Sequence, residues 1–395
     1  MREKQVRLII FPGYFLPHVG GLETHVDEFV KHLSKNKKYD ITIFVPKIPK
    51  FAKEKEIIYN NVKVIRYPAF EVISNFPCLK FWDLKFWKLY FSLYKKDYDI
   101  VMSRTRFFLN SFLGMFFAKF RFKRIKFIHV EHGSDFVKLE SSFKSFIAKV
   151  YDKTFGKLIF LLADKIVAIS DVSYGFVQKE FVKFKREVPI IKRGVDFELY
   201  KNIKKDLNIK KKYKGKIIIG SLCRLYKWKG VENAIKAFIS LDYDVKKKCV
   251  YLIVGDGEDI NRLKKLALNE KNIVFLGLVD FNRAISSLKS FDIFIHSSYM
   301  GGALSNSLLQ ALYCKCSVVA SPNEGAKEVV FNGNTGLLLK NNSVEELRRG
   351  ILKLIIDEHL REELSLNSKK YIEKNFSWNE VVKSYERVFD EVLKG

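Results

Sequence analysis

The stretch Lys216–Gly230, KIIIGSLCRLYKWKG, decides the fold class of this chain. It opens with a short apolar run that predicts a buried strand and continues into a basic loop. The pattern of Val231–Ile239 then predicts a helix. A strand that leads through a loop into a helix is the repeating unit of parallel α/β sheets, so Lys216–Gly230 indicates that class.

The same alternation of strand and helix runs along the whole chain. Two series of similar length predict two doubly wound, Rossmann-like domains, joined in the charged segment Phe197–Lys216. The expected boundaries are 1–202, 203–371 and, for a C-terminal helix after a turn at Asn375-Phe376-Ser377, 372–395. The predicted strands are Arg7–Phe11, Asp40–Val45, Val62–Tyr67, Ile100–Met102, Lys126–Val130 and Lys165–Ile169, then Lys216–Gly220, Val250–Val254, Ile273–Leu276, Ile293–His296 and Ser317–Ala320.

Charge and cysteine content narrow the function classes. The 395 residues include 71 Lys and Arg against 44 Asp and Glu, which gives a net charge of +27 and predicts an anionic partner. Five cysteines are too few, and odd in number, for a disulfide framework, and they fit a reducing compartment. The chain shows neither a signal-peptide pattern nor an apolar run of about 18 residues, so we expect a cytoplasmic protein without a membrane-spanning helix.

Ligands of doubly wound sheets bind at the carboxyl ends of the strands, which directs attention to the loops there. Gly20 and Gly21 precede a predicted helix, where backbone N–H groups can face an anion; the alternative is a tight turn between strand and helix. Arg224 and Lys229 can bracket a diphosphate; the alternative is a solvated basic loop. The polar loop Ser298–Ala311 also allows close approach to a ligand.

Together these segments resemble the family 4 glycosyltransferases of the GT-B fold, in which two Rossmann-like domains face a central cleft. The resemblance covers nearly the whole chain. Arg224 and Lys229-Gly230 match the Arg-Leu-x-x-x-Lys-Gly signature of that family, with Cys223 where a glycine is common. The other matching elements follow in family order: Gly20-Gly21, Gly194-Val195-Asp196, Val254-Gly255-Asp256-Gly257, Phe275-Leu276-Gly277, Gly325-x-x-Glu328 with Gly336, and Phe376-Ser377-Trp378 before a helix that crosses back to the first domain.

The resemblance implies transfer of a sugar from a nucleotide-diphosphate sugar, with retention of configuration and with neither a cofactor nor a required metal. Arg224 and Lys229 would hold the donor diphosphate and stabilise it as it leaves, helped by the backbone at Gly20 and Gly21. Gly325 and Glu328 would lie beside the donor sugar and its phosphates. The acidic cluster Asp256-Gly257-Glu258-Asp259 is interpreted as a helix start and not as a metal site.

In the family, a histidine on a loop of the first domain contacts the donor sugar. Glu131-His132-Gly133 follows a predicted strand here, so His132 is the candidate. The alternative is a structural histidine. We interpret His18, His25 and His296 as structural or packing residues.

The chain departs from the family in the loop before Leu304. Family members carry two glutamates eight positions apart, and the aligned positions here hold Gly302 and Gln310. Gln310 keeps an acceptor oxygen for the ribose but loses the charge, which is expected to weaken donor binding about tenfold. Gly302 has no side chain, so the backbone of Gly302 and Ala303, beside Leu304, is the remaining contact expected there.

The segment Cys78–Lys126 is the compositional outlier, because aromatic residues alternate there with Lys and Arg. This pattern predicts an interfacial surface on an anionic membrane. The alternative is core helices with a solvated basic face. Nucleic acid is not an expected partner, since nothing in the chain resembles a nucleic-acid-binding module.

The leading interpretation is a cytoplasmic glycosyltransferase, peripheral on the inner face of the membrane. It would act on a glycan or lipid-linked acceptor in the biosynthesis of cell-surface glycans or glycolipids. Two alternatives remain open. One is a catalytically silent GT-B relative that binds a nucleotide sugar or a glycan, and the other is a sugar phosphorylase of the same fold.

Overall fold

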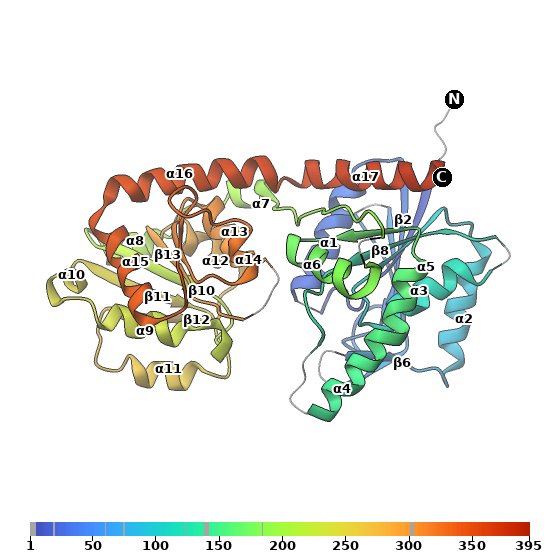
Figure 1. Cartoon of the computed structure of the whole chain (residues 1–395), viewed down its shortest axis with the longest axis horizontal. Coiled ribbons are helices and arrows are strands. Elements are labelled where there is room, and N and C mark those ends of the chain that lie inside the picture. The colour runs from blue at the N-terminus through green and yellow to red at the C-terminus, as the bar shows by residue number, and fades with distance from the viewer. Residues whose placement is uncertain are drawn as a thin grey trace. The chain divides into compact units, whose positions relative to one another are not determined.

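The computed structural model describes residues 5–18, 20–59, 61–73, 76–121, 123–137, 142–183, 185–300 and 304–395. It contains two compact units (Figure 1). Unit 1 comprises Met1–Gly194 and Trp378–Gly395, and unit 2 comprises Val195–Ser377. Each unit is built on a mainly parallel sheet with helices on both faces, which confirms the predicted fold class.

The seven-stranded sheet of unit 1 has the order β3-β4-β2-β1-β7-β8-β9. All pairings are parallel except that of β3 with β4 at one edge. A two-stranded hairpin, β5 with β6, follows β4. The strands are β1 (Val6–Phe11), β2 (Tyr39–Pro46), β3 (Lys55–Ile58), β4 (Val62–Tyr67), β5 (Ala69–Ile73), β6 (Phe76–Leu79), β7 (Ile100–Arg104), β8 (Lys126–Glu131) and β9 (Lys165–Ala168).

Alternate residues of β1 fill two separate cores. Leu8 and Ile10 pack on one face with α1 and α17, and Ile9 and Phe11 pack on the other face with α2, α3 and α5. A central parallel strand is therefore apolar on both sides, as its near-continuous hydrophobic sequence predicts. The helices of unit 1 are α1 (Gly21–Leu33), α2 (Leu84–Ser92), α3 (Leu109–Lys119), α4 (Ser142–Tyr151), α5 (Lys157–Leu162), α6 (Asp171–Val177) and α17 (Trp378–Lys394).

Helix α17 completes the core of unit 1 although it follows unit 2 in the sequence (Figure 1). Its apolar residues recur at helical spacing, as do those of α1, and the two stripes share one core. Trp378, at the start of α17, is 2% exposed and stacks on His32 with ring centroids 5.4 Å apart. A Cβ atom on Gly194 would lie 2.4 Å from the Trp378 ring, so only glycine fits beside it.

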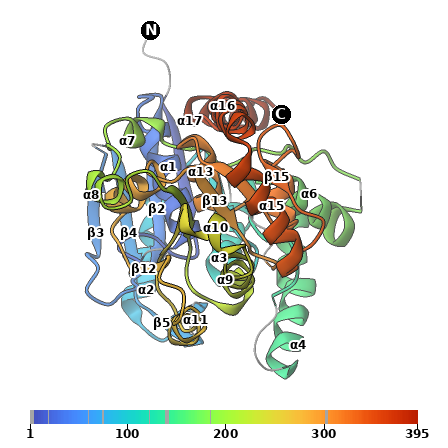
Figure 2. The ribbon, with the colours of Figure 1, turned by 90° about the vertical axis from the view of Figure 1, so that its left-hand side faces the viewer.

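The sheet of unit 2 has the order β12-β11-β10-β13-β14-β15, and all its pairings are parallel. Helices α9, α11 and α15 cover one face, whereas α12, α13 and α16 cover the other. In Figure 2, which views this unit end-on, α9 and α15 lie side by side. The strands are β10 (Ile217–Leu222), β11 (Cys249–Val254), β12 (Ile273–Gly277), β13 (Ile293–His296), β14 (Ser317–Ala320) and β15 (Leu337–Leu338).

The helices of unit 2 are α7 (Phe197–Lys201), α8 (Leu207–Lys212), α9 (Val231–Ile239), α10 (Tyr243–Lys247), α11 (Ile260–Leu266), α12 (Phe281–Leu288), α13 (Asn306–Tyr313), α14 (Glu324–Lys327), α15 (Val344–Ile356) and α16 (Glu358–Asn375). In the described part of the chain, no helix combines the length and the apolarity needed to cross a bilayer.

The observed division of the chain differs in position from the expected boundaries at 202/203 and 371/372. Residues 195–202 belong to unit 2, because Tyr200 is buried in its core and the Val195 N–H donates to the Phe376 carbonyl. Helix α16 likewise stays with unit 2 as far as Asn375, and the break at residues 375–377 separates it from α17. A charged segment is therefore a poor marker of a boundary when one buried residue anchors it.

Replacing Trp378 with Ala should destabilise unit 1 by about 3–5 kcal/mol, because a large buried side chain leaves a cavity. Urea unfolding followed by far-ultraviolet circular dichroism measures the loss. Arg387→Ala, on the exposed side of the same helix, should change stability by less than about 0.5 kcal/mol. Equal effects of the two substitutions would show that α17 is not part of the core.

Candidate active site

The loop after β10 carries the predicted diphosphate ligands Arg224 and Lys229. It ends in a short 3-10 turn, Lys227–Lys229, followed by Gly230 at the start of α9. Gly230 has φ +66°, and a Cβ atom there would lie 2.2 Å from the Ser297 carbonyl oxygen. Glycine is needed at 230 both for its left-handed backbone and for this close approach.

This loop is tied to the residues that follow β13. The Ser297 hydroxyl donates to the Lys229 carbonyl at 2.8 Å, and the Tyr299 N–H donates to the Trp228 carbonyl at 3.2 Å. Two hydrogen bonds thus hold the loop after β10 against the loop after β13 at the carboxyl edge of the sheet, as expected for neighbouring parallel strands.

The two predicted diphosphate ligands differ in environment. Arg224 is exposed, whereas Lys229 is partly buried, with its Nζ atom 4.0 Å from the centre of the Trp228 ring. Burial lowers the pKa of Lys229, partly offset by the nearby Cys223. An anion beside Lys229 would favour its charged form, so this position suits a phosphate ligand.

His296, at the end of β13, reaches the segment that contains Gly325 and Glu328. The side-chain oxygen of Asn323 accepts a hydrogen bond from the Ala326 N–H and so caps α14. The side-chain nitrogen of Asn323 therefore faces His296 Nε2, at 3.1 Å. An amide nitrogen only donates, which makes His296 Nε2 an acceptor and the imidazole neutral. Burial, with the nearby Lys229, lowers the pKa of His296 to about 3.

The structure therefore brings Lys229, His296 and the α14 segment together, and it gives His296 a part that the sequence analysis did not assign. Gly325 and Glu328 are both buried there. His296 cannot be recognised from sequence as the acceptor that holds Asn323, because the pair is 27 positions apart.

Gln310 lies on α13 and faces the start of unit 2. Its amide nitrogen is 3.4 Å from the Tyr200 hydroxyl on α7. Leu304, before α13, is partly buried. Gly302 and Ala303, which were expected to contact the donor through their backbone, lie outside the described residues.

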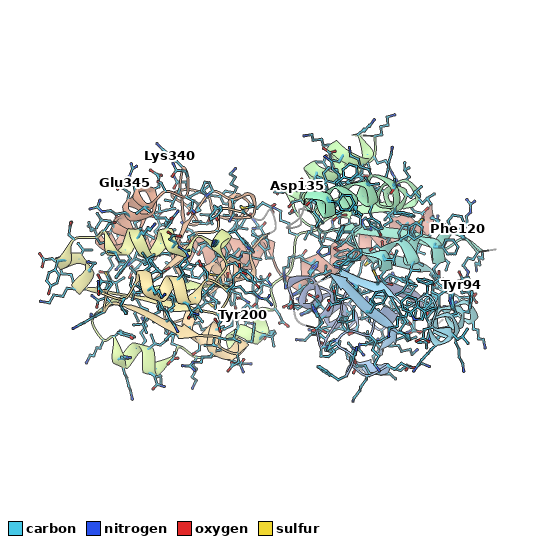
Figure 3. All side chains as sticks on the ribbon, turned by 90° about the horizontal axis from the view of Figure 1, so that it is seen from below. Tyr94, Phe120, Asp135, Tyr200, Lys340 and Glu345 are labelled. Atoms are coloured by element: carbon cyan, nitrogen blue, oxygen red, sulfur yellow. The ribbon has the colours of Figure 1, made fainter. Side chains whose placement is uncertain are left out.

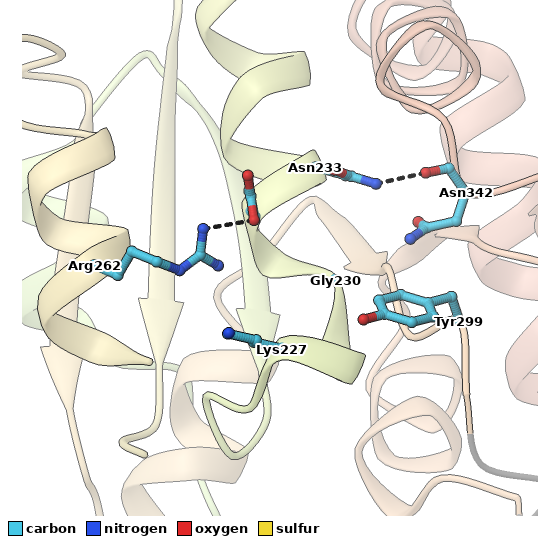
Figure 4. A pocket seen from close by; sticks show the side chains of 7 residues that line it. Lys227, Gly230, Asn233, Arg262, Tyr299 and Asn342 are labelled. Carbon is cyan, nitrogen blue, oxygen red and sulfur yellow. Dashed lines mark hydrogen bonds and ion pairs between the residues drawn. The ribbon is translucent and has the colours of Figure 1, made fainter. Parts of the chain in front are cut away.

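A pocket of about 540 Å³ opens beside this loop (Figure 4). Arg262 there is paired with Glu232 at 2.6 Å, and Asn233 donates to the Asn342 carbonyl at 2.7 Å. Neither Arg224 nor Lys229 lines this pocket, so it is separate from the predicted diphosphate ligands. Its lining is Lys227, Gly230, Glu232, Asn233, Arg262, Tyr299 and Asn342.

In unit 1, His132 follows β8 and lies next to a buried arginine. Its ring meets that of His25 edge-on, with centroids 5.1 Å apart, and His25 Nδ1 is 3.2 Å from Arg104. Burial and the Arg104 cation lower the pKa of both histidines well below the ordinary value, so both are neutral. Within the described residues, His132 Nε2 has no hydrogen-bond partner.

A buried ionic network fixes the turn that carries His132. Arg106 is 3.1 Å from Glu131 and 3.0 Å from Asp152, and all three side chains are buried. Glu131 also accepts from the Gly133 N–H, which closes the turn around His132. Burial alone would raise the pKa of Glu131, but Arg106, His129 and that N–H lower it to about 2.

The predicted glycine loop begins α1 of unit 1. Gly20 is extended, with a φ of −162°, and a Cβ atom there would meet the Glu23 carboxylate at 2.4 Å. A Cβ atom on Gly21 would meet nothing within 4 Å, so its backbone faces open space. Glu23 is buried and bonds to His18 Nδ1 at 2.8 Å, which accounts for His18 as a structural residue.

Acid should destabilise unit 2 through His296. Its pKa is lower when folded than when unfolded, so the unfolded state takes up the proton first as the pH falls below 6.5. Above pH 6.5, neutral His296 therefore does not reduce the stability of the folded state. Below that pH the free energy of unfolding decreases, by about 1–2 kcal/mol near pH 5.

Urea unfolding across this pH range checks the effect of His296. The His296→Gln variant should lose stability less steeply with acid than the wild type, whereas His359→Gln, at an exposed position, should follow the wild type. Parallel profiles for the wild type and His296→Gln would contradict the assignment.

Two glycosyltransferase family models match this chain. The model of Glycosyltransferase Family 4 matches residues 19–199, and that of Glycosyl transferases group 1 matches residues 202–371. An uncharacterized glycosyltransferase of Methanocaldococcus jannaschii is 56% identical over 392 residues, which cover 99% of this chain and 100% of that protein.

Two further proteins are similar over nearly their full length. The N,N'-diacetylbacillosaminyl-diphospho-undecaprenol alpha-1,3-N-acetylgalactosaminyltransferase of Campylobacter jejuni is 25% identical, over 96% of this chain and 98% of that one. The crystal structure of Anabaena HepE in complex with UDP superposes with a TM-score of 0.72 at 16% identity, over 98% and 100% of the two chains. This chain therefore belongs to the family 4 glycosyltransferases and has the GT-B fold.

Proposed function

We propose that this glycosyltransferase transfers a sugar from a nucleotide-diphosphate sugar to a glycan or lipid-linked acceptor, with retention of configuration and without a metal. The observation that carries the proposal is the arrangement around Lys229 in unit 2. There, the loop after β10, the end of β13 and the cap of α14 are joined by the contacts of Ser297 and Asn323.

Cations at this edge of the sheet suit the chemistry of the leaving group. Negative charge grows on the departing diphosphate as its bond to the sugar breaks, and fixed cations stabilise that charge without reorganising. In this proposal Arg224 and Lys229 bind the diphosphate, while Gly325 and Glu328 lie beside the sugar and phosphates. The UDP complex of the similar HepE structure supports a nucleotide donor.

His132 is proposed to orient the donor sugar. Its imidazole is neutral, and Nε2 is buried without a hydrogen-bond partner among the described residues, so this nitrogen still has a hydrogen bond to make once a sugar hydroxyl reaches it. The Glu131–Gly133 contact holds the turn, so the ring is positioned before the substrate arrives. Gly20 and Gly21 are proposed to contribute backbone N–H groups to the diphosphate.

The proposed class of acceptor is inferred from similar proteins. The Campylobacter jejuni protein is named for transfer to a sugar diphospho-undecaprenol, which is a lipid-linked substrate. On this basis we propose a role in the biosynthesis of surface glycans or glycolipids.

Calorimetric titration with uridine, guanosine and adenosine diphosphate sugars tests donor binding. One class should bind, and Arg224→Ala or Lys229→Ala should weaken binding at least tenfold, because each removes a charge-assisted hydrogen bond worth about 1.5–3 kcal/mol. Lys227→Ala removes a cation from the same loop and should leave the affinity within about twofold. Binding that tolerates both Arg224→Ala and Lys229→Ala would place the donor elsewhere.

Turnover separates the proposed enzyme from a silent relative. Transfer to a lipid-linked or glycan acceptor should persist with a chelator present and be lost in Arg224→Ala. Donor binding without transfer to any acceptor would favour the silent relative. Phosphate-dependent cleavage without nucleotide binding would favour the phosphorylase.

Gln310→Glu should raise donor affinity about tenfold, because a carboxylate binds the ribose hydroxyls more strongly than an amide. Tyr200 can donate to the new carboxylate, so the local packing is retained. The same titration measures the change, with Gln310→Leu as the variant that should weaken binding. No gain in Gln310→Glu would show that residue 310 does not read the ribose.

A further inference from the structure

The helical run Ser142–Leu162 is the most unusual surface of unit 1. It consists of α4, a π-helical turn at Asp152–Gly156, and α5, without a break between them. At 1.5 Å per residue the run is about 30 Å long. Figures 1 and 2 both show α4 projecting from the rest of unit 1.

The outward side of this run is apolar. Phe143 is 72% exposed and Phe146 is 64% exposed, and the stripe continues along the run. The opposite side is buried, with Ile159 and Phe160 in the core. A water-facing helix normally has the reverse distribution, so this stripe indicates an apolar partner. Its exposed members are Phe143, Phe146, Ile147, Val150, Leu158 and Leu161.

A row of lysines borders the stripe. Lys149, Lys153 and Lys157 recur every four residues, and all three are exposed. The single acidic residue between positions 142 and 162 is Asp152, which is buried and paired with Arg106. The outward side therefore combines apolar area with positive charge only, and lysine side chains can extend from an apolar surface to reach anionic groups.

We propose that this face of the run Ser142–Leu162 docks flat on an anionic lipid bilayer. An apolar stripe flanked by lysines matches the boundary between acyl chains and charged headgroups. An antiparallel pair of copies joined through this stripe would bring two lysine rows together, and their like charges oppose that arrangement. The net charge of +27, like the lysine row, attracts the protein to an anionic surface.

The neighbouring helices extend this surface. Phe112 of α3 meets Phe155 of the π-helical turn edge-on, with centroids 5.1 Å apart. Beyond that contact, Phe116 of α3 and Phe120, which directly follows this helix, are exposed, and Figure 3 shows Phe120 at the outer edge of unit 1. The membrane surface expected within Cys78–Lys126 thus adjoins the run, but the run itself provides the longest stripe.

Flotation with lipid vesicles tests the proposal on the full chain without donor or acceptor, so its outcome is independent of the proposed reaction. The protein should float with mixed phosphatidylglycerol and phosphatidylcholine vesicles and much less with phosphatidylcholine alone. Changing Lys149, Lys153 and Lys157 to Gln should weaken binding about fivefold per lysine. Phe146→Ser with Leu161→Ser should weaken it at least tenfold.

Matched variants in unit 2 control for charge and apolarity. One control changes the exposed residues Lys264, Lys265 and Lys271 to Gln, and the other combines Leu268→Ser with Ile356→Ser, whose side chains are more exposed than Phe146 and Leu161. Both controls should bind like the wild type. Circular dichroism confirms that each variant is folded. Equal flotation on both vesicle types, or wild-type binding by the Phe146→Ser, Leu161→Ser variant, would overturn the proposal. So would a dimer in sedimentation velocity that this variant abolishes, because the stripe would then bind a second copy.

Discussion

The two regions of unit 1 for which a function is proposed both depend on the buried guanidinium of Arg106. One of its contacts, to Glu131, supports the turn that presents His132. The other, to Asp152, anchors the middle of the helical run whose outer side is apolar. Burial raises the pKa of Asp152 to about 6, although Arg106 opposes the rise. A buried cation that loses a partner costs several kcal/mol, so the turn proposed to contact the sugar and the helix proposed to contact lipid share one constraint.

Unit 2 reaches its geometry through contacts between loops. Gly230 lets α9 begin against the end of β13, and the Ser297 hydroxyl then holds the Lys229 backbone. His296 extends the same contact chain to Asn323 and α14. Each link is a short polar contact at the carboxyl edge of a parallel sheet, where the strands themselves leave backbone groups for ligands. The loops are thereby positioned by one another as well as by the sheet.

Much of this architecture can be predicted from sequence, because central parallel strands are continuous apolar runs. Val62–Tyr67, Ile293–His296 and Ser317–Ala320 are predicted at their observed bounds. The edge strand β3 has four residues of which two are charged, β15 has two residues, and β5–β6 is a hairpin outside the main sheet, so none gives that signal. The candidate site is harder to predict from the sequence than the fold. The signature residues Arg224 and Lys229 can be recognised in the sequence. The buried residues Arg104 and Arg106 cannot, because arginines are expected at the surface. The contacts of Ser297, His296 and Gln310 join positions 27 to 110 apart, and no local pattern encodes them.

The position of α17 in the chain has a consequence for synthesis. Val195–Ser377 is one continuous stretch, so unit 2 can fold once that stretch has left the ribosome. Unit 1 cannot complete its core then, because α17, which packs against the α1 stripe, is translated after unit 2. During elongation, Phe29 of α1 lacks its contact with the Tyr385 ring of α17 for the whole time that unit 2 is being made. Until α17 emerges, nascent unit 1 therefore has an incomplete core, and exposed apolar surface of this kind favours aggregation.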